Sequence, residues 1–124
     1  MEKRNGKGKE YYDNGKLKFD GEYLNGKENG NGKEYWVGKL LFEGEYINGK
    51  KNGKGKEYIF GDLRFEGEYL NGERNGNGKE YWNDKLQFEG EYLNGERNGK
   101  GKEYDKNGNI IFEGEYLKGK RKEN

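Results

Sequence analysis

The chain has 124 residues, of which 27% are hydrophobic and 40% charged, and its 25 basic and 24 acidic residues leave a net charge of +1. So few apolar residues are often typical of disorder, but the balanced charge, 11 Tyr and 2 Trp favour an ordered fold with a thin core. The near-neutral balance argues against a nucleic-acid partner, because nucleic-acid binding normally needs a basic excess.

The residue types that are absent also restrict the function. The sequence contains no Cys, His, Ser, Thr, Ala or Pro. It therefore has no disulfide, no thiolate or imidazole metal ligand and no hydroxyl or thiol nucleophile of the usual kind, so we expect no enzyme, no cofactor and no metal site. No apolar run approaches the roughly 18 residues of a membrane span, and the N-terminus lacks the apolar core of a signal peptide, which predicts a cytoplasmic protein.

Five phenylalanines mark an internal repeat along the chain. They are Phe19, Phe42, Phe65, Phe88 and Phe112, at spacings of 23, 23, 23 and 24 residues. Each is followed by an acidic residue, Gly, Glu and Tyr. A period of this size indicates a stacked array of small supersecondary units. We take residues 1–124 as one array, with repeats starting near each Phe and half repeats at both ends.

Each repeat contains the signals of a β-hairpin. Residues 42–46 alternate between apolar or small and charged side chains, which predicts a strand with one solvated face. Residues 48–53 hold two Asn-Gly pairs, the strongest short-range signal for a turn. A second strand is expected over residues 55–58, followed by a tight turn at residues 60–62. A helix is disfavoured because 24 glycines are scattered through every unit, each costing about 1 kcal/mol in a helix.

Short connections leave only antiparallel neighbours, so the predicted fold is all-β. We expect an elongated single-layer antiparallel β-meander of about ten strands, made of stacked 23-residue hairpins and shaped as a twisted sheet or half-pipe. In the first strand of each repeat a glycine separates two aromatic residues, and we expect a ring from a neighbouring strand to pack over it.

The predicted apolar face collects two groups of side chains from the first strands. The aromatic pairs are Phe19/Tyr23, Phe42/Tyr46, Phe65/Tyr69, Phe88/Tyr92 and Phe112/Tyr116. By parity Leu17, Leu40, Leu63, Leu86 and Ile110 join them.

On the second strands two sets of residues compete for the inward side. One is Tyr11, Tyr35, Tyr58, Tyr81 and Tyr104, and the other is Tyr12, Trp36, Ile59, Trp82 and Asp105. Only one set shares a face with the glycines, and we favour the repeated tyrosines as core.

The sequence FEGEYLNGERNGKGKEY at residues 88–104, repeated with small changes along residues 5–118, resembles the MORN (membrane occupation and recognition nexus) repeat. That resemblance implies β-hairpins stacked into an elongated twisted sheet or half-pipe. The usual pattern has aromatics two and four residues after the last Gly, whereas here Glu57 takes the first place and Tyr58 follows it. This difference is similar to the bacterial-type variant of the repeat.

The ends of the array are expected to carry unpaired strands. Residues 2–6 match the second half of a hairpin turn such as residues 96–99, and a first strand at residues 115–117 closes the sequence without a partner. Pairing these open edges between molecules would continue the array into dimers or filaments. The alternative is that the charged start and the charged residues 118–124 prevent pairing.

Four residues are candidates for a binding surface: Tyr12, Trp36, Ile59 and Trp82. The two Trp hold equivalent places two units apart, and an aromatic row could bind a peptide, a sugar or a flat ligand. Core packing is the alternative for both. The paired carboxylates of each unit, such as Glu43 and Glu45, are interpreted as cross-strand partners of Lys and Arg.

These observations predict a non-enzymatic scaffold for protein–protein interaction or assembly, with edge-strand pairing as one route. The resemblance implies an alternative, binding to anionic lipid head groups, for which Lys50, Lys51 and residues 118–122 are the available basic cluster. A third interpretation, an engineered or fragment array without independent activity, follows from the near-identity of the units.

Overall fold

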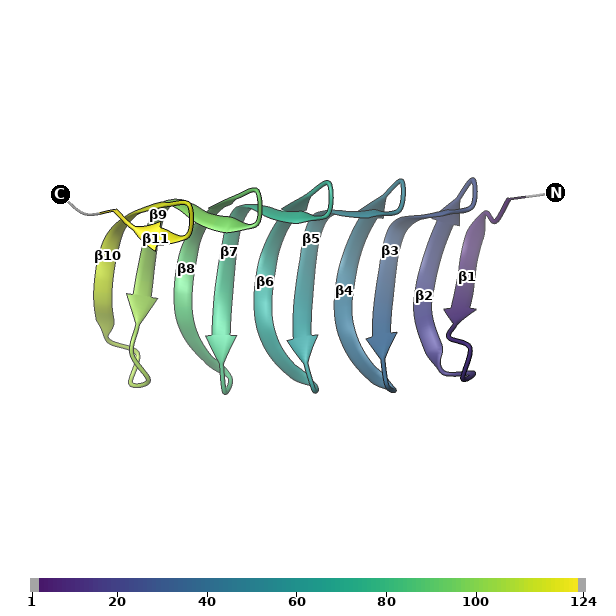
Figure 1. Ribbon diagram of the computed structural model, residues 1–124, viewed down its shortest axis with the longest axis horizontal. Coiled ribbons are helices and arrows are strands. Elements are labelled where there is room, and N and C mark those ends of the chain that lie inside the picture. Colours follow the sequence, from purple (N-terminus) through teal and green to yellow (C-terminus); the bar gives the residue numbers. More distant parts are fainter. Residues whose placement is uncertain (1–2, 123–124) are drawn as a thin grey trace.

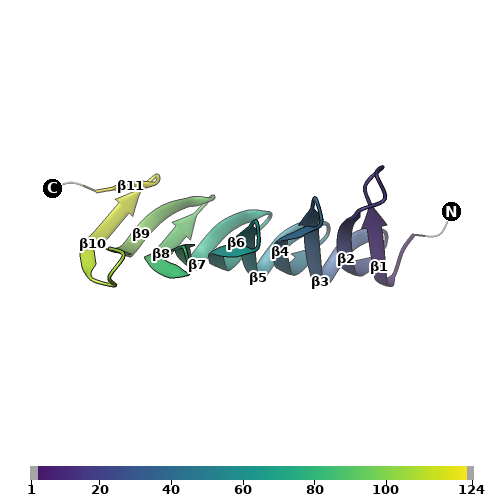
Figure 2. The ribbon, with the colours of Figure 1, turned by 90° about the horizontal axis from the view of Figure 1, so that it is seen from below.

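The computed structural model describes residues 3–122, which form a single open sheet of eleven antiparallel strands in sequence order. The strands are β1 (Gly6–Tyr11), β2 (Leu17–Leu24), β3 (Lys27–Trp36), β4 (Lys39–Ile47), β5 (Lys50–Ile59), β6 (Asp62–Leu70), β7 (Glu73–Trp82), β8 (Lys85–Leu93), β9 (Glu96–Tyr104), β10 (Ile110–Leu117) and β11 (Lys120–Arg121). Figures 1 and 2 show the strands following one another along one long axis. The predicted meander is confirmed, with the short β11 beyond the ten strands expected.

The 23-residue period follows from the lengths of the elements. A ten-residue strand such as β5, a two-residue turn, a nine-residue strand such as β6 and a second two-residue turn make one repeat. The turn predicted over residues 48–53 is shorter in the structure, because only Asn48 and Gly49 form it, with φ of 52° and 83°. Positive φ at both residues is the geometry of a type I′ turn, which matches the twist of the flanking strands.

The second Asn-Gly pair lies inside a strand and makes a β-bulge. In β5 the register shifts between the pairs Gly44↔Gly55 and Tyr46↔Lys51. Gly53 has φ of 97°, and the Glu45 carboxylate accepts the backbone N–H of Lys54 at 2.7 Å. The bulge therefore uses the residues that the sequence pattern assigns to a turn.

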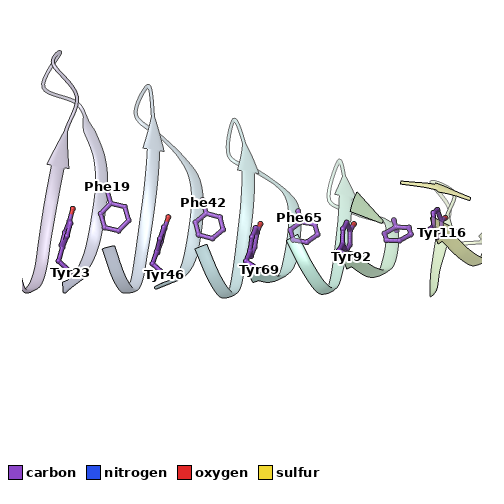
Figure 3. Close-up of a cluster of buried hydrophobic side chains, with 9 residues drawn as sticks. Phe19, Tyr23, Phe42, Tyr46, Phe65, Tyr69, Tyr92 and Tyr116 are labelled. Carbon is purple, nitrogen blue, oxygen red and sulfur yellow. The ribbon is translucent and has the colours of Figure 1, made fainter. Parts of the chain in front are cut away.

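Nine aromatic side chains form the buried core, and their rings make one row along the sheet (Figure 3). They are Phe19, Tyr23, Phe42, Tyr46, Phe65, Tyr69, Phe88, Tyr92 and Tyr116. Neighbouring rings meet edge to face at centroid distances from 5.1 to 5.8 Å, within and between repeats. A Cβ added at Gly55 would lie 2.5 Å from Phe42 Cζ and 3.0 Å from Tyr69 Cε1. Rings from neighbouring strands therefore pack over the glycines of the second strands. The prediction for the first-strand glycines is wrong in its partner, because a Cβ added at Gly44 would meet the backbone of Lys54 and Gly55 and the ring of Phe42 in its own strand.

The aliphatic residues expected beside these rings do not join the buried core. Leu17, Leu40, Leu63 and Leu86 are only partly buried, and Ile110 is 52% exposed. They lie beyond a second register shift, where Glu57 pairs with Phe65 but Tyr58 pairs with Leu63. The extra residue at this shift breaks the alternation on which the prediction by parity depends.

The prediction that the repeated tyrosines of the second strands belong to the core is wrong. Tyr11 is 59% exposed, and Tyr35, Tyr58, Tyr81 and Tyr104 are partly buried. The position that shares the face of the glycines is the glutamate before each tyrosine. Such a glutamate is tolerated there because it accepts the hydroxyl proton of a core tyrosine, as Glu57 does from Tyr69.

Hydrogen bonds join each two-residue Asn-Gly turn to the preceding repeat. Gly49 N–H donates to Glu28 O at 2.8 Å, and Asn48 N–H donates to Asn29 Oδ1 at 3.1 Å. The same pair of bonds recurs at the other Asn-Gly turns. Each hairpin is therefore held by its neighbours through the sheet ladder, the ring row and the turns.

The two outermost strands differ in how far they are covered. In the described part of the chain β1 has one neighbouring strand, β2. The prediction that the strand at residues 115–117 lacks a partner is wrong, because β11 pairs with it through Tyr116↔Arg121 and Leu117↔Lys120. Residue 2 of the expected half turn and residues 123–124 of the charged tail lie outside the described residues. The described residues contain no helix of the length and apolarity needed to cross a membrane.

Candidate functional site

The four candidate binding residues lie at the ends of strands on one long side of the sheet. Trp36, Ile59 and Trp82 are the last residues of β3, β5 and β7, and Tyr12 directly follows β1. All four therefore precede the tight turns that line the lower side of the sheet in Figure 1. We call this side, with the residues of its turns, the aromatic edge.

The structure brings two of these residues into contact. The rings of Tyr12 and Trp36 meet edge to face with centroids 5.3 Å apart, and the Tyr12 hydroxyl donates to Tyr35 O at 2.8 Å. Trp82 contacts a different partner, since the Arg64 guanidinium carbon lies 4.2 Å from its ring centroid. Arg64 Nε is buried without a hydrogen-bond partner, which is consistent with a guanidinium held flat against the indole.

Both tryptophans are exposed to solvent. Trp36 is 55% exposed and Trp82 is 50% exposed, while Ile59 is 45% exposed. Core packing, the alternative for the two Trp, is therefore wrong for this structure. Large apolar side chains held half-exposed on rigid strand ends are suited to contact with another molecule.

Two further apolar residues of the aromatic edge are not among the binding residues predicted from the sequence. Phe60 and Val37 are the first residues of two-residue turns, and they are 79% and 57% exposed. Both have positive φ, 49° and 50°. Bulky side chains rarely adopt this conformation, and Asn holds the corresponding turn position elsewhere. A bulky apolar residue at a turn position is the sequence signal that identifies them.

The other prominent feature is a groove on the face opposite the rings. Its floor is the line of glycines that separate the aromatic residues, and charged side chains flank it on both sides. One flank alternates in sign from strand to strand: Asp20, Lys33, Glu43, Lys56, Glu66, Lys79, Glu89, Lys102 and Glu113.

The repeated carboxylates of this groove are engaged within the sheet. Glu43 lies opposite Lys33 and Lys56 and accepts the Tyr58 hydroxyl at 2.6 Å, while Glu45 accepts a backbone N–H. The interpretation as cross-strand partners of Lys and Arg holds for the register of Glu43, although Glu43 makes no ion pair within residues 3–122. It is wrong for Glu45, which lies opposite Asn31. Burial, together with the hydrogen bond to Glu43, raises the pKa of Tyr58 to about 12.

Charged groups on the ring side form clamps between repeats. Burial alone would raise the pKa of Glu57, but hydrogen bonds from Arg74 and Tyr69 outweigh it and lower that pKa. The arginine keeps the carboxylate ionised and the tyrosine stays neutral, so both groups are suited to stabilising the fold rather than to transferring protons. Within residues 3–122 no three His, Cys, Asp or Glu side chains are grouped to hold a metal ion.

Comparison with known families agrees with this architecture. The model of the MORN repeat matches residues 3–16, 19–39, 42–59, 65–87 and 88–110. A comparison with curated proteins finds no match. MORN repeats are a non-enzymatic repeat family known for interaction with proteins or membrane lipids. Because the family model covers most of the chain and each match contains one hairpin period or part of it, this chain belongs to the MORN repeat family.

Proposed function

We propose that this chain is a non-enzymatic protein-binding scaffold that holds its partner along the aromatic edge. The observation that carries the proposal is the exposure of Trp36 and Trp82, 55% and 50%, at equivalent places two repeats apart. Tryptophan is one of the residue types enriched among the residues that carry most of the binding energy of protein interfaces. The neighbouring Val37 and Phe60 extend the apolar surface.

The spacing along the edge fits an extended peptide segment. Trp36 and Trp82 end strands that are four strands apart in the sheet, which corresponds to roughly 19 Å. About six residues of extended chain cover that length. Lys39 and Lys85 lie directly across from the two tryptophans. We therefore propose a partner segment that combines large apolar side chains with acidic ones.

The test compares three forms of the protein as bait for partners from cells. The double variant Trp36→Ala/Trp82→Ala removes the anchors and should retain the fold, since both side chains are exposed. The control Lys33→Ala/Lys79→Ala changes two equivalent residues in the groove. We expect a protein captured by the wild type and by the control but not by the tryptophan variant. Equal capture by all three would show that the aromatic edge is not the binding surface.

Binding to anionic lipid is the rival function and is less well supported. In its basic cluster, Lys51 is engaged with the core, since its Nζ lies 4.2 Å from the Phe42 ring centroid. Lys50 is the first residue of β5, but the equivalent first residues of β7 and β9 are the acidic Glu73 and Glu96. Flotation with anionic liposomes at physiological salt separates the two functions. Salt-sensitive flotation that survives the tryptophan substitutions would favour the lipid function.

Assembly through the outer strands is a further part of the proposal. The side of β1 away from β2 has no strand beside it in residues 3–122, and the two-residue β11 covers only the end of β10. Unpaired strand edges favour the addition of another strand. Pairing of β1 with the open part of β10 in another copy would be a head-to-tail contact, so mass should grow without limit as concentration rises.

A further inference from the structure

A row of aliphatic side chains runs along the side of the sheet that carries the Asn-Gly turns. Four of them are the last residues of β2, β4, β6 and β8: Leu24, Ile47, Leu70 and Leu93. Their exposures are 52%, 54%, 50% and 49%, so the described part of the chain leaves all four equally uncovered. Leu117, the last residue of β10, continues the line and is 55% exposed. Strand alternation directs them away from the buried tyrosine that precedes each one.

The residue directly across from each aliphatic side chain is charged, and the charges are ordered along the sheet. The register pairs are Leu24↔Lys27, Ile47↔Lys50, Leu70↔Glu73 and Leu93↔Glu96. Two bases are thus followed by two acids, and Lys120, across from Leu117, adds a base beyond them. The four charged residues of these register pairs are exposed, and none takes part in an ion pair between residues 3 and 122. We call the four aliphatic and four charged residues together the turn-side row.

We propose that two copies of this chain pair side by side and antiparallel through the turn-side row. A two-fold axis between the second and third pairs of the row places Lys50 of each copy against Glu73 of the other. The same axis places Lys27 against Glu96. These four charges of each copy then meet an opposite charge, and the aliphatic residues meet one another between them. Leu117 and Lys120 lie beyond the end of the partner's row. The contact closes on itself, because one surface serves both copies.

The geometry of the repeat keeps these contacts in register. Successive members of the row are two strands apart, which is about 10 Å, and the turns that carry them lie in one line in Figure 1. Equal spacing lets two antiparallel rows match along their whole length. A parallel arrangement in register would place Lys against Lys and Glu against Glu, and like charges across from each other are unfavourable. A parallel arrangement displaced by two members would make three contacts between opposite charges, counting Lys120, whereas the antiparallel pair makes four. The order of charges therefore selects the antiparallel pair.

The size of the surface sets the expected strength. Four half-exposed aliphatic side chains and their charged neighbours lie at the low end of specific interfaces, where association is weak and reversible. We expect a dissociation constant on the order of 0.1 mM that rises with ionic strength. This pairing does not involve the aromatic edge, so it is independent of the proposed binding function.

The test is a charge exchange followed by sedimentation equilibrium at low salt. Lys27→Glu/Lys50→Glu makes the row entirely acidic, and Glu73→Lys/Glu96→Lys makes it entirely basic. We expect the wild type to approach twice the monomer mass as concentration rises, each variant alone to remain monomeric, and an equimolar mixture of the two to form the dimer again. The control Lys39→Glu/Lys85→Glu carries the charge of the acidic variant outside the row and should dimerise like the wild type.

Four outcomes would overturn the proposal. The wild type could remain monomeric up to about ten times the expected dissociation constant. The two variants could dimerise as well as the wild type, or fail to associate when mixed. Growth beyond the dimer that is unchanged by the charge exchange would assign association to the outer strands instead. Far-ultraviolet circular dichroism confirms that each variant is folded, which is expected because all four altered residues are exposed.

Discussion

Arg74 of β7 reaches across β6 to Glu57 of β5 and lies over the ring of Phe65 on the way. Its Nε and Nη2 donate to the two carboxylate oxygens at 2.9 and 3.0 Å, and its guanidinium carbon is 4.0 Å from the ring centroid. Arg97 makes the same clamp with Glu80. A clamp of this kind joins strands of consecutive repeats that are not adjacent in the sheet, and it covers the exposed face of the aromatic row.

One repeat carries an acidic residue where the others carry a cation. Glu28 holds the place of Arg74, and Phe19 is the phenylalanine of the row with no cation over its ring among residues 3–122. Glu10 there accepts the Tyr23 hydroxyl at 2.5 Å but lacks an arginine. We predict that Glu28→Arg completes the clamp and stabilises the fold by about 1 kcal/mol. The midpoint of urea unfolding measures the gain.

A neutral substitution separates the clamp from the simple loss of a negative charge. Glu28→Gln removes the acid without supplying a guanidinium, so it should recover only part of the gain. If the Gln and Arg variants unfold at the same urea concentration, the clamp contributes no stability at this position.

Gly67 should not tolerate even a methyl group. A Cβ there would lie 2.6 Å from Asn77 O and 2.7 Å from Gly78 Cα, and neither backbone atom is free to move within the sheet. We predict that Gly67→Ala destabilises the protein by roughly 2–4 kcal/mol. Gly8 lies on the outermost strand, β1, and the nearest atom to a Cβ added there is the side-chain atom Tyr23 Cε1, at 3.1 Å. Gly8→Ala should therefore cost much less in thermal unfolding, and equal costs would contradict the packing argument.

The strands and their inward glycines are predictable from the sequence because period-two alternation holds from Phe42 through Gly44 to Tyr46. The facing of Tyr58 is not predictable in the same way. It depends on the register shift that leaves Arg64 unpaired, and such a shift carries no residue signal of its own. The position of the charged Glu57 on the buried face is also not predictable from the sequence. Its partners Tyr69 and Arg74 are distant in sequence and meet it only in the assembled sheet.

The core tyrosines should make the fold sensitive to high pH. Burial, followed by hydrogen bonding to a glutamate, raises the pKa of Tyr116 to about 12 and that of Tyr69 still further from the ordinary value of 10.0. A raised pKa in the folded state means that this stability is complete below pH 10 and is lost as pH rises through the folded values. We predict cooperative unfolding between about pH 10 and 12, followed by circular dichroism.

Tyrosinate absorbance gives the control for this titration. In concentrated denaturant the same absorbance should rise near the ordinary value of 10.0, without a cooperative step. Ionisation of most tyrosines near that value in the folded protein, with no change in circular dichroism, would contradict the hydrogen-bonded arrangement.

The two tryptophans should differ in their access to solvent quenchers. Both are about half exposed, but the Arg64 guanidinium covers one face of Trp82, whereas Trp36 meets the edge or face of Tyr12. We predict red-shifted emission from both, with acrylamide quenching of Trp82 increased when Arg64 is replaced by Ala. Single-tryptophan variants, Trp36→Phe and Trp82→Phe, assign the signals. Blue-shifted emission that acrylamide does not quench would contradict an exposed aromatic edge.

Removal of one whole repeat should preserve the fold. Deleting residues 43–65 takes out 23 residues and joins Phe42 to Glu66, which restores the aromatic-acidic-Gly-Glu-Tyr strand. Because each hairpin contacts only its neighbours, the ring row, the turn bonds and the sheet ladder close again with identical partners. We predict a cooperative unfolding transition. The slope of the unfolding free energy against urea concentration should fall by roughly a fifth, in proportion to the surface removed.

A deletion one residue shorter provides the matched control. Removing residues 43–64 leaves Phe42 next to Phe65, so the extra residue reverses the facing of one part of the strand relative to the other. Either an aromatic ring is then exposed to solvent or a charged side chain lies over the glycines. The altered strand cannot pair in the native register with both of its neighbouring strands. This variant should unfold at a much lower urea concentration than the 23-residue deletion. Equal midpoints would mean that stability does not depend on the phase of the repeat, contrary to the nearest-neighbour contacts described above.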